Sequence, residues 1–206
     1  MRRIKLSSAH LIPLSFLAAI IVGTLFLSLP VSSSEGNWTP LTDALFTATT
    51  SVCVTGLVVK DTYQYWSMFG QIVILILIQI GGIGVITAAS TLIMLAGKRF
   101  SLSERLMLRD AMNLENLNDL LAFLYRVIRG TLVVETAGAL LYMLAFIPRF
   151  GVARGVWASV FNAVSAFCNA GIDVLGPDSL APFHDDPLVL CVTMALIVMG
   201  GLGYVV

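Results

Sequence analysis

The chain has little charge for its length. Only 12% of its 206 residues are Asp, Glu, Lys or Arg, whereas a typical soluble domain carries about 25%. Hydrophobic residues make up 58% of the chain, and its mean hydropathy is +0.93. So few charges cannot cover a water-facing surface, and the composition favours a membrane protein. Twelve basic residues balance twelve acidic ones, so the net charge indicates no nucleic-acid partner.

Cysteine and histidine are also scarce. The three cysteines, Cys53, Cys168 and Cys191, are odd in number, widely spaced and without a Cys-x-x-Cys pair. This pattern argues against a disulfide framework and against a zinc site. The two histidines, His10 and His184, lie far apart, and nothing in the sequence pairs them with a nucleophile. We therefore expect no catalytic residues and no cofactor, and an integral membrane enzyme is the least favoured class.

Four long apolar runs are expected to span a membrane. They cover residues 11–30, 66–96, 131–147 and 187–206, the last reaching the end of the sequence without a polar exit. The first run would span about 30 Å as a helix, which is a full hydrocarbon core. We therefore interpret it as a retained spanning helix rather than a signal peptide.

Two shorter segments, 38–57 and 156–172, lie between these runs. Each is too short and too polar to span, and both are rich in Thr, Ser, Asn and Gly. Irregular backbone at membrane depth must be buried in protein or line a watery cavity, so both are predicted re-entrant loops. The expected fold is all-α: two helix–pore loop–helix units, at 1–97 and 130–206, with the second unit truncated at its C-terminal end.

The segment 98–129 is expected to be a cytoplasmic connecting loop. Its Ser101-Leu-Ser-Glu104 motif is a capping box, which predicts a short amphipathic helix. This helix would lie on the inner membrane surface or dock a cytoplasmic partner. The N-terminus and this segment together hold nine of the twelve basic residues, which predicts a cytoplasmic N-terminus.

Acidic residues gather on the opposite, outer side of this predicted topology. They are Glu35, Asp43, Asp61, Asp173, Asp178, Asp185 and Asp186. Acidic side chains near an outer mouth can raise the local cation concentration. The alternative is a solvated rim without that role.

The sequence repeats itself. Residues 45–57 align without a gap on residues 160–172, so that Cys53 matches Cys168 and Gly56 matches Gly171. An even number of predicted crossings separates the copies, so both point the same way. Two such units can be related by an axis along the membrane normal, as pore-forming units are.

The repeated loops have the chemistry of a cation filter. A short helix over residues 41–51 would place its negative C-terminal end near mid-membrane, and an extended strand over residues 52–56 would return outward. Backbone carbonyls there can replace the water shell of potassium, with no other metal ligand. Glycine supplies the positive φ that such a turn needs. The predicted filter residues are Val52, Cys53, Val54, Thr55, Gly56, Phe167, Cys168, Asn169, Ala170 and Gly171.

A second glycine cluster also occurs twice. It comprises Gly81, Gly82 and Gly84, repeated as Gly200, Gly201 and Gly203. Small residues let membrane helices approach closely, so we interpret these as helix-packing glycines rather than a gating hinge. One acidic residue, Glu135, lies inside the third run; Arg126 or Arg129 could neutralise it, or it could contribute to an ion path.

Six segments resemble the Trk/Ktr/HKT superfamily of potassium transporters, most closely the membrane subunit of bacterial Ktr systems. They are TDALFTATT (42–50), CVTGLV (53–58), FGQIV (69–73), QIGGIG (79–84), GKRFSL (97–102) and AVSAFCNAGID (163–173). The resemblance covers essentially the whole chain. It implies channel-like potassium transport across the plasma membrane, the bacterial inner membrane, with one filter glycine per pore loop: Gly56 and Gly171.

The resemblance also implies partners. These are the lipid bilayer, a second complete subunit in a homodimer, and a cytoplasmic nucleotide-binding regulatory ring. The family has four pore units in one chain around a pseudo-fourfold axis, whereas this sequence has two. We therefore expect an N-terminal half whose pore is completed by the missing C-terminal half or a second copy. The alternatives are a sodium-permeable relative and a non-conducting half-subunit or scaffold.

Overall fold

The computed structural model describes residues 8–84 and 120–202, and this part of the chain is helical. Two short 3-10 turns, η1 (Pro30–Ser32) and η3 (Ala181–Phe183), lie in the connections. The contact between Ser33 and Trp66 is an isolated bridge. The helices are α1 (Ser8–Ser28), α2 (Leu41–Val52), α3 (Thr62–Tyr65), α4 (Met68–Ile83), α7 (Leu120–Phe150), α8 (Val152–Phe167) and α9 (Pro187–Leu202). The predicted all-α class is confirmed for these residues. The capping box at 101–104 and Gly203 lie outside them.

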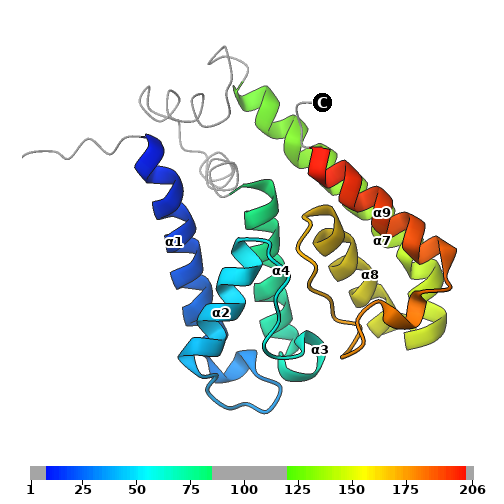
Figure 1. The fold of residues 1–206 in the computed structure, drawn as a ribbon, viewed down its shortest axis with the longest axis horizontal. Coiled ribbons are helices and arrows are strands. Elements are labelled where there is room, and N and C mark those ends of the chain that lie inside the picture. The colour runs from blue at the N-terminus through cyan, green and yellow to red at the C-terminus, as the bar shows by residue number, and fades with distance from the viewer. Residues whose placement is uncertain (1–7, 85–119, 203–206) are drawn as a thin grey trace, which may run out of the picture.

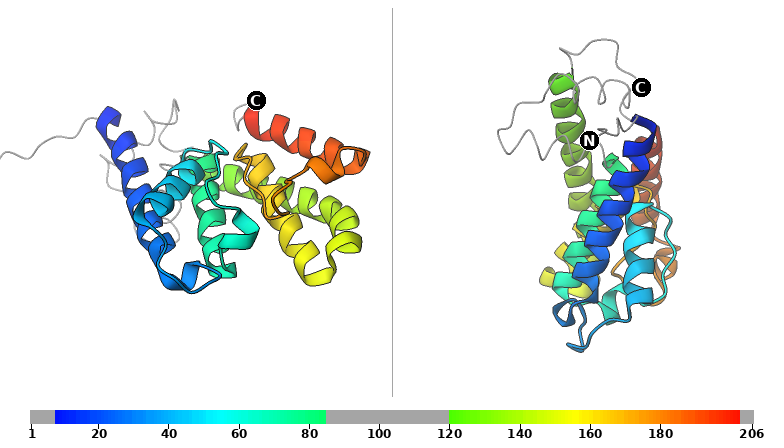
Figure 2. Two further views of the ribbon diagram at one scale, coloured as in Figure 1. Left: turned by 60° about the horizontal axis from the view of Figure 1, so that its bottom comes forward. Right: turned by 90° about the vertical axis from the view of Figure 1, so that its left-hand side faces the viewer.

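The helices form two similar groups of three. In the first group α1, α2 and α4 pack on one another, and in the second α7, α8 and α9 do the same. The groups stand side by side and meet where α4 packs on α8 (Figure 1). A turned view keeps the same division (Figure 2, left). In the first group α2 ends partway along the longer α1 and α4, and in the second α8 ends partway along the longer α7 (Figure 1).

The helix α7 is longer than the run 131–147 predicted. It starts at Leu120 and continues through Pro148 to Phe150. A proline lacks only its own N–H, so close to a helix end it removes one backbone hydrogen bond without stopping the helix. The part from Tyr125 to Phe150 is the one described helix that is long and apolar enough to cross a membrane. The described parts of three other helices, Pro13–Ser28, Met68–Ile83 and Pro187–Leu202, are apolar but shorter.

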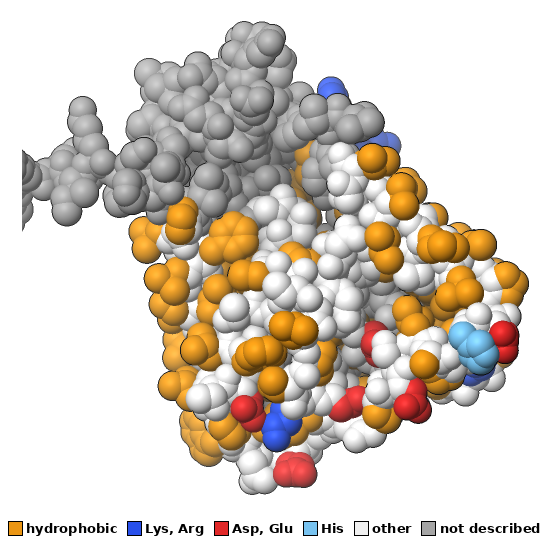
Figure 3. All heavy atoms as spheres, in the orientation of Figure 1, with side chains coloured by type: hydrophobic (Ala, Val, Ile, Leu, Met, Phe, Trp, Pro, Cys, Tyr) orange, Lys and Arg blue, Asp and Glu red, His pale blue; other side chains and the backbone are white. Residues whose placement is uncertain are grey.

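The outward sides of these helices are covered with hydrophobic side chains (Figure 3). In contrast, the acidic side chains gather along the end of the molecule where the connecting loops lie (Figure 3). The exposed hydrophobic residues include Leu17, Ile21, Leu25 and Phe26 on α1, Leu132, Val133, Leu140 and Leu144 on α7, and Met194, Val198 and Met199 on α9. Exposed apolar side chains over this much surface fit a lipid environment.

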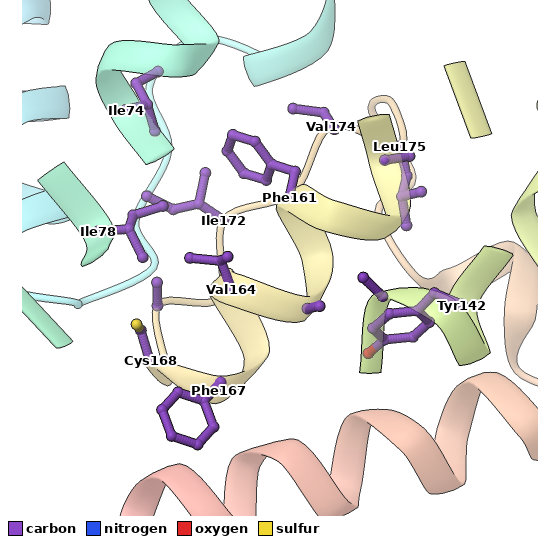
Figure 4. Packing of buried hydrophobic residues seen from close by; sticks show 14 of the residues in the cluster. Ile74, Ile78, Tyr142, Phe161, Val164, Phe167, Cys168, Ile172, Val174 and Leu175 are labelled. Atoms are coloured by element: carbon purple, nitrogen blue, oxygen red, sulfur yellow. The ribbon is translucent and has the colours of Figure 1, made fainter. Parts of the chain in front are cut away.

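The two groups share one hydrophobic core. Figure 4 shows Ile74 and Ile78 of α4 pointing toward Phe161 and Val164 of α8 and toward Ile172 in the loop after it. All five are buried. The shared core means that the position of one loop depends on the helices of the other group.

A polar contact between the groups lies beside this core. The indole Nε1 of Trp157 donates to Oε1 of Gln71 at 2.6 Å, and Nε2 of Gln71 donates to the carbonyl oxygen of Trp66 at 2.9 Å. Gln71 is 6% exposed. Its amide group is thus bound on both sides, which fixes α8 against α4.

Candidate functional site

The loops after α2 and α8 have the same backbone conformation. The N–H of Thr55 donates to the carbonyl of Thr50 at 3.0 Å, and the N–H of Ala170 donates to the carbonyl of Ser165 at 2.8 Å. In each loop one hydroxyl also binds the backbone of the residue that follows the loop glycine. In the first loop, Oγ1 of Thr50 accepts from the N–H of Leu57 at 3.0 Å. In the second loop, Oγ of Ser165 accepts from the N–H of Ile172 at 3.1 Å. Every member of the second set lies 115 positions after its counterpart, as in the sequence repeat (50 to 165, 55 to 170, 57 to 172).

Positive φ angles occur at matching positions in both loops. Val54 has φ 56° and Gly56 has φ 77°, while Asn169 has φ 60° and Gly171 has φ 66°. A β-branched residue such as Val54 rarely adopts this conformation, so the hydrogen bonds around it must impose it. Alternation between left-handed and ordinary backbone turns successive carbonyl groups out of the helical direction.

This conformation differs from the extended strand that the sequence predicted. Val52 and Phe167 are the last residues of α2 and α8, and the irregular backbone begins after them. The N–H groups of Cys53 and Cys168 still bond back to the carbonyls of Thr49 and Val164. Each helix therefore keeps its pattern one residue longer than expected, and a turn at residues 53–54 and 168–169 comes before the irregular backbone of residues 55–56 and 170–171.

The two loops meet at their glycines. A Cβ added to Gly56 would lie 2.8 Å from the carbonyl oxygen of Ala170 and 3.5 Å from the Cα of Gly171. A Cβ added to Gly171 would lie 3.6 Å from the Cα of Gly56. Two glycines from segments 115 positions apart thus approach backbone to backbone. A side chain at either position would meet both an unfavourable φ and the opposite loop.

The remaining loop side chains differ between the copies. Cys168 is buried, and a Cβ on Gly82 of α4 would overlap its sulfur, whereas Cys53 is exposed. The difference arises because Cys168 lies at the interface between the groups, where α4 covers it.

The second glycine cluster lies behind the loops. A Cβ on Gly81 would overlap the carbonyl oxygen of Val52, and one on Gly200 would overlap that of Phe167. Gly201 has more space, since its nearest neighbour, Nδ2 of Asn169, would be 3.7 Å away. Gly84 has φ 89° and is the C-cap of α4. Close backbone approach thus recurs at the same place in both groups, against the last carbonyl of α2 or α8.

Glu135 is 6% exposed and lies between the groups. Its Oε1 accepts from Nε2 of Gln79 on α4 at 3.0 Å. From the sequence, Arg126 or Arg129 was a candidate partner for Glu135. In the described residues, the hydrogen bond to its carboxylate comes from the uncharged amide of Gln79. This contact joins α7 to α4 in addition to the Trp157–Gln71 contact.

Sequence reasoning missed Thr50 and Ser165 as residues that hold the loops. A signal for them was present, because Thr50 and Ser165 occupy matching positions of the repeat and both carry a hydroxyl. It also did not connect Arg154 with Leu175, whose carbonyl accepts from Nη2 of Arg154 at 2.9 Å. No pattern in the sequence places these two residues together.

The fold and the loops define a class: a helical membrane protein in which a helix–loop–helix arrangement occurs twice. The TrkH family, described as cation transport protein, matches residues 14–206. The chain belongs to this family of cation transport proteins.

Curated relatives agree with the family. The chain is 41% identical over 204 residues to the potassium/sodium uptake protein NtpJ of Enterococcus hirae, covering 99% of this chain and 45% of that protein. It is 36% identical to the Ktr system potassium uptake protein B of Bacillus subtilis, covering 98% and 45%. To Ktr system potassium uptake protein D of the same organism it is 34% identical, covering 97% and 44%. The chain thus spans less than half the length of these relatives.

Proposed function

We propose that the chain supplies two of the pore units of a potassium transporter. In this proposal residues 52–56 and 167–171 line a channel-like path, where backbone carbonyls replace the water shell of the ion. One observation carries it: two loops with the same hydrogen bonds and the same positive φ angles meet at Gly56 and Gly171. The helix ends before each loop direct partial negative charge to the same region, which favours a cation.

Sodium permeation is the second candidate function. It is favoured by the relative at 41% identity, which is a potassium/sodium uptake protein by name. A third possibility, a non-conducting scaffold, would keep the fold without transport. Measurements with both ions separate these three possibilities, because they predict potassium preference, little preference and no uptake respectively.

The remaining parts of the proposal follow from the resemblance and the sequence. The chain would act in the plasma membrane with its N-terminus in the cytoplasm, and it would have no enzymatic activity. Further pore units, from a C-terminal half or a second copy, would complete the path. A homodimer of the complete subunit and a cytoplasmic nucleotide-binding ring would be its partners.

The test is cation uptake into potassium-starved cells that express the assembled transporter with Gly56→Ser or Gly171→Ser. We expect either variant to lower the ratio of potassium to sodium uptake more than it lowers the protein level. Gly36→Ser is the matched control, because Gly36 has φ 71° but no neighbour within 4 Å and lies away from both loops. Unchanged ratios in both loop variants, at normal protein levels, would contradict the proposal.

A further inference from the structure

The second loop is held differently from the first. In the first loop, Oγ1 of Thr50 lies 2.7 Å from Oγ1 of Thr55, so a hydroxyl pair ties the loop to the end of α2. The position matching Thr55 is Ala170, which has no hydroxyl. The second loop therefore lacks this hydroxyl–hydroxyl hydrogen bond, and other contacts must hold it in place.

Such contacts are found at Leu175, just after the second loop. Oδ1 of Asp173 accepts from the N–H of Leu175 at 2.9 Å, and Nη2 of Arg154 donates to the carbonyl of Leu175 at 2.9 Å. The hydroxyl of Ser179 donates to the other oxygen of Asp173. Both backbone polar groups of Leu175 are thus bound by charged side chains, and charge-assisted hydrogen bonds are the stronger kind.

Arg154 also connects this segment to the first group of helices. Its guanidinium carbon lies 3.9 Å from the ring centroid of Tyr63, on α3, and 4.5 Å from that of Phe150, at the end of α7. A guanidinium between two aromatic rings is held by cation–π attraction. Its Nε is buried without a hydrogen-bond partner, so stacking and the bond to Leu175 fix its position.

The first loop has no counterpart of this arrangement. At the repeat spacing, Val58 matches Asp173 and Thr39 matches Arg154, so neither charge recurs. The contact is therefore specific to the second loop, and through Tyr63 it joins that loop to the first group.

We propose that Arg154 and Asp173 are positioning residues of the second loop, which fix Leu175, tie the loop exit to Tyr63 and so determine how the assembled path discriminates between cations. The inference rests on the proposed function. Its physical basis is that discrimination depends on the number and placement of the oxygens around the ion. Gly171 directly precedes Ile172, whose N–H bonds to Ser165, and Leu175 lies three residues after Ile172. Loss of the contacts to Leu175 therefore loosens the segment that leaves the loop, and the carbonyl groups just before that segment can then change direction.

Asp173 could instead act through its charge, by concentrating cations near the mouth. Asp173→Asn separates the two mechanisms, because an amide has the same shape and retains an oxygen that accepts from Leu175. Asp173→Ala removes both the shape and the charge. Asp185→Asn is the charge control, since the side chain of Asp185 is 89% exposed and contacts His184 rather than the loop.

The experiment measures potassium and sodium uptake in potassium-starved cells expressing the assembled transporter. We expect a several-fold lower potassium-to-sodium ratio for Asp173→Ala and a nearly unchanged ratio for Asp173→Asn and Asp185→Asn. Arg154→Lys should lower the ratio as much as Arg154→Gln, because lysine has neither the planar group for stacking nor the fork of donors. Equal loss in Asp173→Asn and Asp173→Ala, or no loss in any variant, would overturn the inference.

Tyr63 provides a test that leaves the second loop unaltered. Tyr63→Phe keeps the ring beneath Arg154 and should behave like the unmodified protein, whereas Tyr63→Leu should lower the ratio. If neither Tyr63 variant changes it, the link between the groups has no role. If the Gly56 and Gly171 variants change the ratio while those of Arg154, Asp173 and Tyr63 do not, the inference fails and the proposed function stands.

Discussion

Gly200 lies against Phe167 so closely that a Cβ on Gly200 would overlap the last carbonyl oxygen of α8. Gly81 has the same relationship to Val52 at the end of α2. Gly81 thus allows α4 to pack directly on the C-terminal end of α2, and Gly200 allows α9 to pack directly on the C-terminal end of α8. The loop that begins at this end is positioned by a backbone contact rather than by adaptable side chains.

This contact predicts a specific pattern of stability. Gly81→Ala and Gly200→Ala should each destabilise the fold by about 1–3 kcal/mol, because the added methyl group must displace a helix end. Gly201→Ala should be neutral or slightly stabilising, since its methyl group would make an ordinary contact and alanine favours a helix. Thermal unfolding of the purified protein in detergent measures the three variants. Equal midpoints for Gly200→Ala and Gly201→Ala would contradict the close contact.

The hydroxyls of Thr50 and Ser165 give a second prediction. Thr50→Val and Ser165→Ala each remove the acceptor for a backbone N–H, which costs about 1–3 kcal/mol where the group stays buried. We expect lower thermal stability and a lower potassium-to-sodium uptake ratio in both. Thr49→Val is the control, because the hydroxyl of Thr49 bonds only to the carbonyl of Leu45 in its own helix. The prediction is wrong if Thr49→Val loses as much as Thr50→Val.

Asp173 gives a prediction about external pH. Burial raises the pKa of its carboxyl group, and the nearby charge of Asp61 raises it further, against hydrogen bonds from Ser179 and Leu175 that lower it. The folded protein therefore binds a proton at a higher pH than the ordinary value of about 3.9. A protonated carboxyl keeps an oxygen that accepts from Leu175, as the amide in Asp173→Asn does, so the potassium preference should stay nearly constant as the external pH decreases toward the raised pKa.

The raised pKa of Asp173 does make stability depend on pH. Because the folded state binds this proton more tightly than the unfolded state, the contribution of Asp173 to stability is present below the ordinary pKa. It is lost as the pH rises through the raised value. Arg154 is a basic side chain that contacts the same segment, through the carbonyl of Leu175. In Asp173→Asn this dependence of stability on pH should be absent. A potassium preference that falls at acid pH in the unmodified protein but not in this variant would contradict the expected constancy and show that the charge of Asp173 contributes to discrimination.

Membrane orientation can be tested by cysteine labelling in intact cells. After Cys53 and Cys191 are replaced by serine, a membrane-impermeant reagent should label Glu35→Cys and leave Ser103→Cys unlabelled. The expectation follows from the nine basic residues in the N-terminus and the segment 98–129. Labelling at position 103 but not at position 35 would reverse the topology.

Much of the fold was predictable because each signal is local. Apolar runs placed α1, α4, α7 and α9, and the segments between them placed α2 and α8. Helix ends were less accurate, as the extension of α7 to Phe150 illustrates. An apolar run in the sequence marks only the part of a helix that lies in the hydrocarbon core. The helix itself continues beyond that core wherever its backbone hydrogen bonds can form.

The repeat also identified the glycines that approach one another, because matching glycines in two loops imply a shared backbone requirement. It could not identify the contacts of Arg154 or Glu135. Arg154 bonds to Leu175 and stacks on Tyr63, and Glu135 bonds to Gln79 from another group of helices. These contacts depend on how the two groups pack together, and each involves a residue without a counterpart in the repeat.

The central claim is that the loops at Gly56 and Gly171 bind the transported cation through their backbone. It is tested most directly by a crystal structure of the assembled transporter grown with rubidium, whose anomalous scattering locates the ion. We predict an anomalous peak on the axis between the two loops, within coordination distance of backbone carbonyl oxygens from both 52–56 and 167–171. A rubidium site away from both loops, or loops that face lipid, would contradict the account.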